Sequence, residues 1–424
     1  MKHNFYGHTD PGKKHSNNDD FYLLDDTLGL IIVCDGVSGN ENPKLASETC
    51  ARAIRDYINK NFAHVKKYEK DRSLKNRAKI ATLLTSALQA ANTQIYNLGA
   101  KAGSAKGKMA TTAEVLLMLP DYAIVAHVGD SRTYMLRNGQ AHPLTEDHRM
   151  AVDMQKSGEW TKEQALHSPY GNVLTRSIGT EEKVVPDVLQ MELMSGDYFL
   201  LCTDGLTEYL RANELPDMIT RPDLSHVPRQ LVDFANSRGG SDNVTVAVAR
   251  VDNDGPATIA MDVLAKTDVI GKVPLFRYMM YEELLQILAI VRLDQFGPED
   301  MICKEGDPSD KMFIITKGAV EIFKGKKVIA RRLKGDTIGE MGLFDKAPRS
   351  ASVKSTDQTL VLTLGRKELL ELLRQDSQIA VKFLWAMNQA LNQRIREASL
   401  ELIVEKVEKE ESTLVDLPFR AKKT

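Results

Sequence analysis

Short apolar runs that end in an acidic residue recur along the first 253 residues. Leu30–Cys34 leads into Asp35, and Tyr198–Cys202 leads, one residue later, into Asp204. A run of this length that ends at a turn is typical of a buried strand. The same pattern predicts strands at Phe21–Leu24, Leu30–Cys34, Ala113–Leu119, Ala123–Val128, Thr133–Arg137, Tyr198–Cys202 and Val244–Val251.

Longer segments between these runs have helical periodicity. Pro43–Asn61 and Lys75–Leu98 are predicted helices, and Ile80, Leu84 and Leu88 share one face of the second. Several strands are separated by only a few residues, which is hairpin spacing. We therefore expect an α+β fold in which a β-sandwich of antiparallel sheets is flanked by helices.

The pattern changes after a polar segment, residues 252–262, that contains Gly-Pro. A predicted helix near Tyr281–Val291 precedes short strands separated by glycine turns about every 8–12 residues, which favours a small β-roll with flanking helices. We expect domains at 1–253 and 274–411, with a linker at 254–273 and a flexible tail at 412–424.

The second domain is predicted to end in a long helix, from Arg366 to about Glu411. Apolar residues recur there at spacings near a heptad, which favours a homodimer through this helix. The alternative is that the helix packs on its own β-roll. The residues concerned are Leu384, Met387, Leu391, Ile395, Ala398 and Leu402.

The amino-acid composition limits the classes of binding partner that we expect. The chain of 424 residues is 42% hydrophobic and 27% charged, and Lys+Arg 56 against Asp+Glu 58 leaves a net charge of −2. This balance does not favour nucleic acid or an anionic membrane as a partner. The sequence has neither an 18-residue apolar run nor a signal-peptide pattern, so we expect a cytoplasmic protein.

Acidic residues at predicted strand ends are the first candidate site. Asp19, Asp35, Asp130, Asp204 and Asp242 all have this position. One Asp-Gly is usually only a turn, but five such acids in one domain predict that they converge on a divalent metal. Oxygen ligands without histidine or cysteine neighbours favour Mg²⁺ or Mn²⁺ over zinc, and a pair of such ions suits phosphoester hydrolysis.

The acids lie within eight short motifs whose order along the chain resembles that of the metal-dependent Ser/Thr phosphatases of type 2C. The resemblance covers nearly all of residues 5–252 and implies a protein phosphatase acting on phosphoserine and phosphothreonine. The motifs are Thr9–Asp19, Asp35–Gly39, Thr111–Thr112, Gly129–Arg132, Leu144–His148, Asn172–Gly179, Cys202–Leu206 and Asp242–Thr245.

The resemblance also implies a role for each acid. Asp35, with the carbonyl of Gly36, would ligate two central ions together with Asp204 and Asp242, and a hydroxide between the ions would attack the phosphate. Asp19 would hold metal-bound water, and Asp130 would share a third ion with Asp204.

The sequence departs from the family at the phosphate grip. Lys14 stands where members usually have an arginine, and a lysine lacks the forked geometry that holds two phosphate oxygens. Asn18 also replaces the usual Glu or Gln. The resemblance implies a flap over the substrate groove at residues 150–180. Among other polar residues, we expect Arg132 to pair with a carboxylate, His148 to hydrogen-bond locally and His127 to be a core imidazole.

The second candidate site lies in the predicted β-roll. Glu340 follows a glycine and opens a predicted short helix, and Arg349 follows nine residues later. A helix N-terminus beside an arginine can bind an anion, although a surface salt bridge is the alternative for this pair alone. Residues 274–400 resemble cyclic nucleotide-binding domains. That implies a bond from Arg349 to the cyclic phosphate and from Glu340 to the ribose hydroxyl, with the amides of Gly342 and Ser350 completing the site.

The base is harder to assign. The Arg349-Ser350-Ala351 order is similar to that of the catabolite activator protein, which favours cAMP over cGMP. Trp385 could stack on the base or fill the contact between helix and roll. The leading hypothesis is a phosphatase regulated by a cyclic nucleotide. The alternatives are an inert phosphatase fold that acts as a nucleotide-gated binding partner, and a constitutive phosphatase whose sensor serves localisation or dimerisation.

Overall fold

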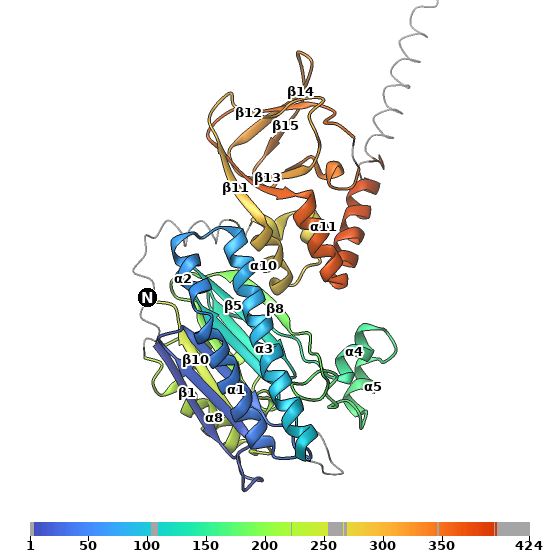
Figure 1. Ribbon diagram of the computed structural model, residues 1–424. Helices are drawn as coiled ribbons and strands as arrows, with labels where there is room; N and C mark the ends of the chain where they lie inside the picture. The colour runs from blue at the N-terminus through green and yellow to red at the C-terminus, as the bar shows by residue number, and fades with distance from the viewer. Residues whose placement is uncertain are drawn as a thin grey trace, which may run out of the picture. The chain divides into compact units, whose positions relative to one another are not determined.

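The computed structural model describes residues 4–102, 109–221, 223–252, 266, 269–345, 347–393 and 395–396. The chain divides into two compact units, residues 1–264 and 265–424. Each unit has its own hydrophobic core (Figure 1).

Two five-stranded antiparallel sheets form the first unit. One sheet has the order β2-β3-β4-β5-β8 and the other β1-β10-β9-β6-β7. The first consists of β2 (Asp20–Asp25), β3 (Leu30–Asp35), β4 (Ala113–Met118), β5 (Tyr122–Val128) and β8 (Asp187–Glu192). The second consists of β1 (Asn4–Asp10), β10 (Val244–Arg250), β9 (Tyr198–Cys202), β6 (Arg132–Arg137) and β7 (Gln140–Pro143).

Helices cover the outer face of each sheet. On the first, α1 (Pro43–Lys60), α2 (Ala63–Lys70) and α3 (Leu74–Ala102) share a core with β3, β4 and β5 (Figure 1). On the second, α6 (Asp204–Thr207), η1 (Ala212–Glu214), α7 (Leu215–Ile219) and α8 (Val227–Ser237) do the same. Ile31 and Val33 are also fully buried, and strand alternation turns them toward the opposite sheet. The predicted helix-flanked sandwich is confirmed.

Each strand predicted in this unit is present within two residues of its expected ends. The strands β1, β7 and β8 were not predicted. Each lies at the edge of a sheet, where one side of the strand stays partly exposed and polar residues interrupt the apolar pattern.

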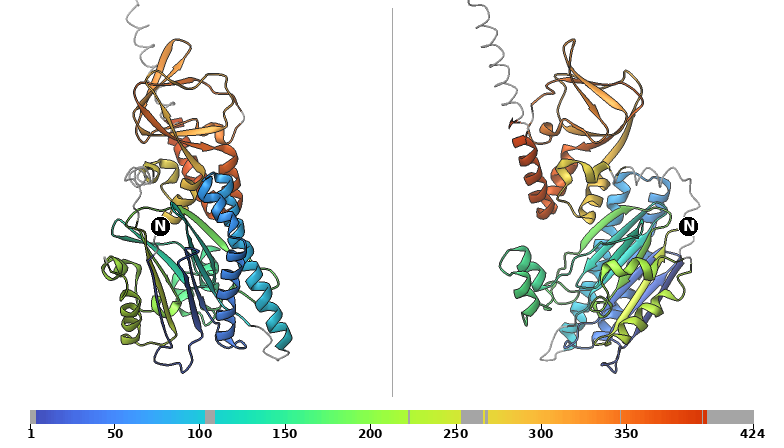
Figure 2. Two further views of the ribbon diagram at one scale, coloured as in Figure 1. Left: turned by 60° about the vertical axis from the view of Figure 1, so that its left-hand side comes forward. Right: turned by 180° about the vertical axis from the view of Figure 1, so that it is seen from behind.

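Two short helices, α4 (Met150–Lys156) and α5 (Lys162–His167), form the predicted flap. They stand clear of the sandwich in Figure 2. Thr161 caps α5 by accepting a hydrogen bond from the Gln164 amide. At the base of the flap, the Met150 amide donates to the Val173 carbonyl, so the two limbs of the flap are hydrogen-bonded to each other.

Two four-stranded antiparallel sheets form the second unit, with orders β11-β18-β13-β16 and β12-β17-β14-β15. Helix α10 (Tyr281–Ile290), α11 (Arg366–Gln375) and the turn η2 (Pro274–Phe276) pack on the first sheet around Phe276 and Phe383. The strands are β11 (Val291–Phe296), β12 (Met301–Cys303), β13 (Lys311–Lys317), β14 (Ala319–Lys324), β15 (Lys327–Leu333), β16 (Thr337–Ile338), β17 (Ser352–Ser355) and β18 (Thr359–Gly365). The predicted β-roll with flanking helices is confirmed.

The prediction of one uninterrupted helix from Arg366 is wrong. Helix α11 ends at Gln375, and helical structure resumes at residues 377–393. The break occurs at Asp376, whose carboxylate accepts hydrogen bonds from the amides of Gln378 and Ile379 and so caps a new helix.

Some predictions lie outside the described residues. These are the polar boundary at 253–262, the tail at 412–424, and the seam positions Ala398 and Leu402. In the part of the chain that the structure describes, no helix is both long enough and apolar enough to cross a membrane.

Candidate functional sites

The sheets bring the predicted acids to one end of the sandwich. Asp35 ends β3, Asp204 follows β9, Asp130 follows β5, and Asp242 lies just before β10. Strand pairing brings these residues together, because Asp20 is the cross-strand partner of Asp35 and β9 pairs with β10. The acids that the sequence places far apart therefore form one cluster.

The carboxylates in this cluster repel one another. Burial raises the pKa of Asp35 well above its usual value, and the charges of Asp20 and Asp204 raise it further. Burial likewise raises the pKa of Asp204, to about 6, and Asp130 adds to the shift. The buried Oδ1 of Asp204 has no hydrogen-bond partner. Crowded carboxylates with an unsatisfied oxygen suit a bound cation.

The donors fit a pair of hard divalent ions. Asp35, Asp204 and Asp242 supply carboxylate oxygens, and Gly36 supplies a carbonyl at a point where a side chain would collide with the Pro43 backbone. Among the described residues, no three acidic, histidine or cysteine side chains already form a complete ligand set. Magnesium usually retains several waters and binds one or two carboxylates, so this donor set is of the expected kind.

At the start of β2, the structure places Asp20, not Asp19, among the acids. Asp20 is 4% exposed, accepts a hydrogen bond from the Thr203 hydroxyl at 2.9 Å and has its other oxygen buried without a partner. Asp19 contributes through its backbone, because its carbonyl accepts hydrogen bonds from the amide of Gly36 and the hydroxyl of Ser47. The predicted water-holding role of Asp19 stays a prediction, and Asp20 is a site residue that the sequence did not reveal.

The predicted phosphate-binding role of Lys14 stays a prediction. Lys14 is exposed, whereas the neighbouring His15 places its Nε2 3.6 Å from Asp242 Oδ1. Asn18 is engaged in the fold, since its amide donates to the Thr9 hydroxyl. His15 is thus a second polar residue near the cluster that sequence reasoning missed.

Arg149 lies between Asp130 and Asp204. It donates to Asp130 Oδ2 at 2.6 Å and to Asp204 Oδ2 at 2.7 Å. The expectation that these two acids share a third ion stays a prediction, and in this structure a guanidinium lies between their oxygens. Arg149 follows directly after the Leu144–His148 motif and carried no signal of its own.

Several residues expected to be structural are confirmed as such. Arg132 forms a two-pronged ion pair with Asp147, at 2.7 and 2.8 Å. His127 lies 2.5 Å from a carboxylate oxygen of Glu114, its partner across β4 and β5. His148 accepts from the Gly129 amide and pairs through Nε2 with the carboxylate of Asp187.

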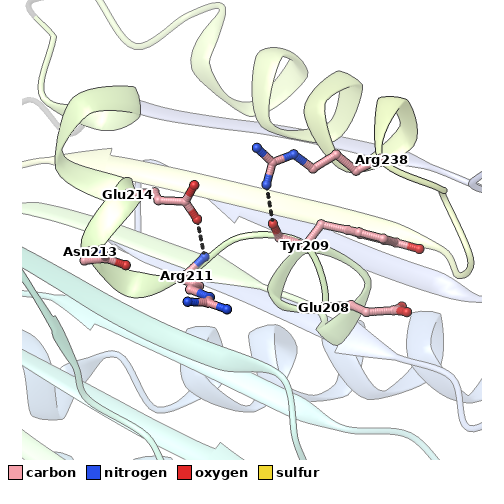
Figure 3. Close-up of a pocket in the computed structure, with 6 residues that line it drawn as sticks. All are labelled: Glu208, Tyr209, Arg211, Asn213, Glu214 and Arg238. Carbon is pink, nitrogen blue, oxygen red and sulfur yellow. Dashed lines mark hydrogen bonds between the residues drawn. The ribbon is translucent and has the colours of Figure 1, made fainter.

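Two surface hollows lie near this end of the first unit. One, of about 680 Å³, is lined by residues that include Asp147, Lys156 of the flap and Thr207 of α6, so it borders the cluster. The other, of about 620 Å³, is shown in Figure 3. Its polar groups are largely paired, since Arg238 donates to the Tyr209 carbonyl and Glu214 accepts from the Arg211 amide. The first hollow is the better candidate for substrate contact, because a residue of the flap lines it.

Arg349 is the central feature of the second unit's candidate site. Its side chain is 8% exposed and lies over the Phe313 ring at 5.4 Å. Nη2 donates to the Lys311 carbonyl at 2.6 Å, but Nε and Nη1 are buried without a hydrogen-bond partner. Gly339 has φ +77°, and any side chain there would strike the guanidinium. A buried cation with unsatisfied donors calls for an anion.

Glu340 lies beside this arginine as the first residue of η3 (Glu340–Leu343). It is buried, and it lines a cavity of about 830 Å³ that Met387 and Asn392 of the helical segment 377–393 close from the other side. Gly342 is buried in the same turn, while Ser350 is exposed. Neither Arg349 nor Trp385 is among the residues that line the cavity, and Trp385 is 61% exposed.

Comparison with known proteins identifies the family of each domain. The family model Protein phosphatase 2C matches residues 6–244, and Cyclic nucleotide-binding domain matches residues 293–376. The Protein phosphatase PhpP of Streptococcus pneumoniae is 35% identical over 250 residues, 58% of this chain and 96% of that protein. The Serine/threonine phosphatase stp of Listeria welshimeri is 33% identical over 242 residues, 56% and 92% of the two chains. The solved serine/threonine phosphatase of S. agalactiae is 33% identical with TM-score 0.50, covering 59% of this chain and 100% of that one.

The chain belongs to the protein phosphatase 2C family, whose members depend on divalent metal ions. It is a protein serine/threonine phosphatase with a cyclic nucleotide-binding domain toward its C-terminus.

Proposed function

We propose that this chain hydrolyses phosphoserine and phosphothreonine in cytoplasmic proteins with Mg²⁺ or Mn²⁺, and that a cyclic nucleotide bound to Arg349 regulates the rate. The observation that carries the regulatory part is the buried Arg349 guanidinium, whose Nε and Nη1 lack partners. A cyclic phosphate would supply oxygens for these donors, and the left-handed Gly339 leaves the space that the Arg349 guanidinium occupies.

The phosphatase part rests on the acid cluster. Asp35, Asp204, Asp242 and the carbonyl of Gly36 would hold the two ions, which when bound supply Lewis acidity and an activated water. The chain's own residues then have supporting tasks. Asp20, held by the Thr203 hydroxyl, keeps a carboxylate beside Asp35. The exposed Lys14, with His15 next to it, would offer nitrogen donors to the substrate phosphate.

We favour cAMP over cGMP as the effector. The preference rests on the Arg349-Ser350-Ala351 order and on the polar residues of the helical segment that faces Glu340. Gln389 and Asn392 both line that cavity, and amide side chains can bond the donor and acceptor edge of adenine. A homodimer through the C-terminal helix also belongs to the proposal.

Two measurements on the full chain test this function. The first is Mn²⁺-dependent hydrolysis of a phosphothreonine peptide by wild type and Asp35→Asn, where activity in the wild type alone is expected. The second is calorimetric titration with cAMP and cGMP of wild type, Arg349→Ala and the matched control Arg292→Ala, whose exposed arginine lies on β11. Nucleotide binding that only Arg349→Ala abolishes is expected. Binding without any hydrolysis would favour the alternative of an inert, nucleotide-gated binding module, and equal binding by Arg349→Ala would overturn the effector site.

A further inference from the structure

A side chain of the flap reaches the two acids that the family resemblance assigns to a third ion. Arg149 Nη2 is 2.6 Å from Asp130 Oδ2 and 2.7 Å from Asp204 Oδ2. We propose that the Arg149 guanidinium takes the place of a third divalent ion in this chain, so that the protein binds two ions at its acid cluster. This inference rests on the proposed metal-dependent function and refines it.

A guanidinium and a metal ion cannot both occupy this position. Mg²⁺ or Mn²⁺ bridging Asp130 and Asp204 would need carboxylate oxygens at about 2.0–2.2 Å, within the space that the Arg149 nitrogens fill. Arginine keeps its charge at any pH at which the protein is folded. A third ion would therefore have to break a largely buried ion pair, in which the side chains of Arg149 and Asp130 are 18% and 9% exposed.

The two carboxylate oxygens of Asp204 have different surroundings, so pairing with Arg149 leaves one of them free to bind a central ion. Oδ2 is taken by Arg149, whereas the buried Oδ1 has no hydrogen-bond partner. Asp204 can thus ligate a central ion through Oδ1 while Oδ2 stays paired. The arginine excludes the outer ion and leaves the inner pair of sites available.

Arg149 is held in this position by both limbs of the flap. It immediately precedes α4, its backbone pairs with Leu174, and its Nη1 donates to Asn172 Oδ1 at 3.3 Å. A competing acid, Asp147, is already occupied by Arg132 and lies 3.9 Å from Arg149 Nε. The side chain is therefore directed to Asp130 and Asp204, and it ties the base of the flap to the acid cluster.

Metal stoichiometry tests the proposal without any activity readout. Equilibrium dialysis of the full chain against Mn²⁺ is expected to give two bound ions for wild type, three for Arg149→Ala, and two for the charge-preserving control Arg149→Lys. Three ions in the wild type, or two in Arg149→Ala, would overturn the inference. No bound ion in the wild type would overturn the proposed metal-dependent function, and the inference with it.

A second variant guards against a folding defect in Arg149→Ala. If Asp130 holds Arg149 instead of a metal, Asp130→Asn in the wild-type background leaves two ions bound. In the Arg149→Ala background the same change is expected to reduce three ions to two. Loss of an ion on making Asp130→Asn in the otherwise wild-type chain would show that Asp130 is a metal ligand and contradict the proposal.

Discussion

At the scale of single residues, the acid cluster is a point where function opposes stability. Burial and like charges raise the pKa of Asp35 and Asp204 in the folded chain, so each ionised carboxylate destabilises the metal-free fold. A bound divalent cation reverses the sign of that contribution. The cluster is thus built for a ligand and not for the empty protein.

This opposition gives a prediction for Asp35→Asn. The change removes one buried negative charge, so the metal-free protein should be stabilised by about 1 kcal/mol, or about 2–4 °C in the thermal midpoint. With Mn²⁺ present, the phosphatase rate should fall by about 100-fold or more, since a ligand is lost. Thermal unfolding with and without Mn²⁺ checks the prediction. A lower midpoint for the metal-free variant would contradict it.

The sequence located this cluster to within one residue. Asp-Gly motifs after apolar runs identified Asp35 and Asp204, because a strand end fixes where such a carboxylate emerges. The motif does not show which of the adjacent residues Asp19 and Asp20 joins the cluster. That depends on the face of β2 toward which each side chain points. Phe21 packs toward the helices on one face of β2, so Asp20 faces the other sheet and joins the acids. Arg149 could not be foreseen, since its target is set by the fold of the flap.

At the scale of elements, paired polar residues tie the strands to the flap. Glu114 of β4 and His127 of β5 are cross-strand partners, and both are buried. His127 also bonds the Glu146 carbonyl in the segment that leads to the flap, and its ring lies 4.4 Å from that of His148. These contacts position the chain that carries Arg149.

Removing one member of the buried pair should be costly. Glu114→Ala leaves the His127 imidazole without its carboxylate in a fully buried site, so we expect a loss of about 3 kcal/mol in the free energy of unfolding. Urea unfolding of the full chain checks this, with Glu48→Ala, at a partly exposed position, as a control that should change stability by less than about 0.5 kcal/mol. A loss no larger than that of the control would contradict the structural role.

The neighbouring His148 predicts a pH dependence. Burial lowers its pKa from 6.5 to about 4, while Asp187 partly opposes the shift and His127 and Arg176 support it. Between these two pKa values the unfolded chain binds the proton and the folded chain does not, so stability falls as pH is lowered through this window. The wild type should lose about 2 kcal/mol between pH 7 and pH 5 relative to His148→Gln. Equal slopes for the two proteins, with saturating Mn²⁺, would refute this assignment.

Strand prediction from sequence succeeded for the strands inside the sheets and missed the edge strands β1, β7 and β8. The interior strands β3, β4, β5 and β9 are buried and mostly apolar, so their bounds follow from the pattern. The edge strand β1 has histidine, glycine and threonine at partly exposed positions. The break at Asp376 was missed because a capping carboxylate can also stand on a helix surface, and local sequence does not separate the two.

At the scale of the whole molecule, one chain joins a phosphatase unit and a nucleotide-binding unit. The motifs that define each unit are local, so the sequence was sufficient to predict both folds. Coupling between them is not local. A nucleotide can alter the phosphatase rate only if its affinity differs between two states of the chain that also differ in activity.

The most direct test of the central claim is the Mn²⁺-dependent rate on a phosphothreonine peptide, with and without saturating cAMP or cGMP, in the full chain. Wild type should change its rate at least about 5-fold with nucleotide. Arg349→Ala should keep one rate in both conditions, and Arg292→Ala should respond as wild type does. A wild-type rate that is the same with and without nucleotide would contradict a nucleotide-regulated phosphatase and leave a constitutive enzyme.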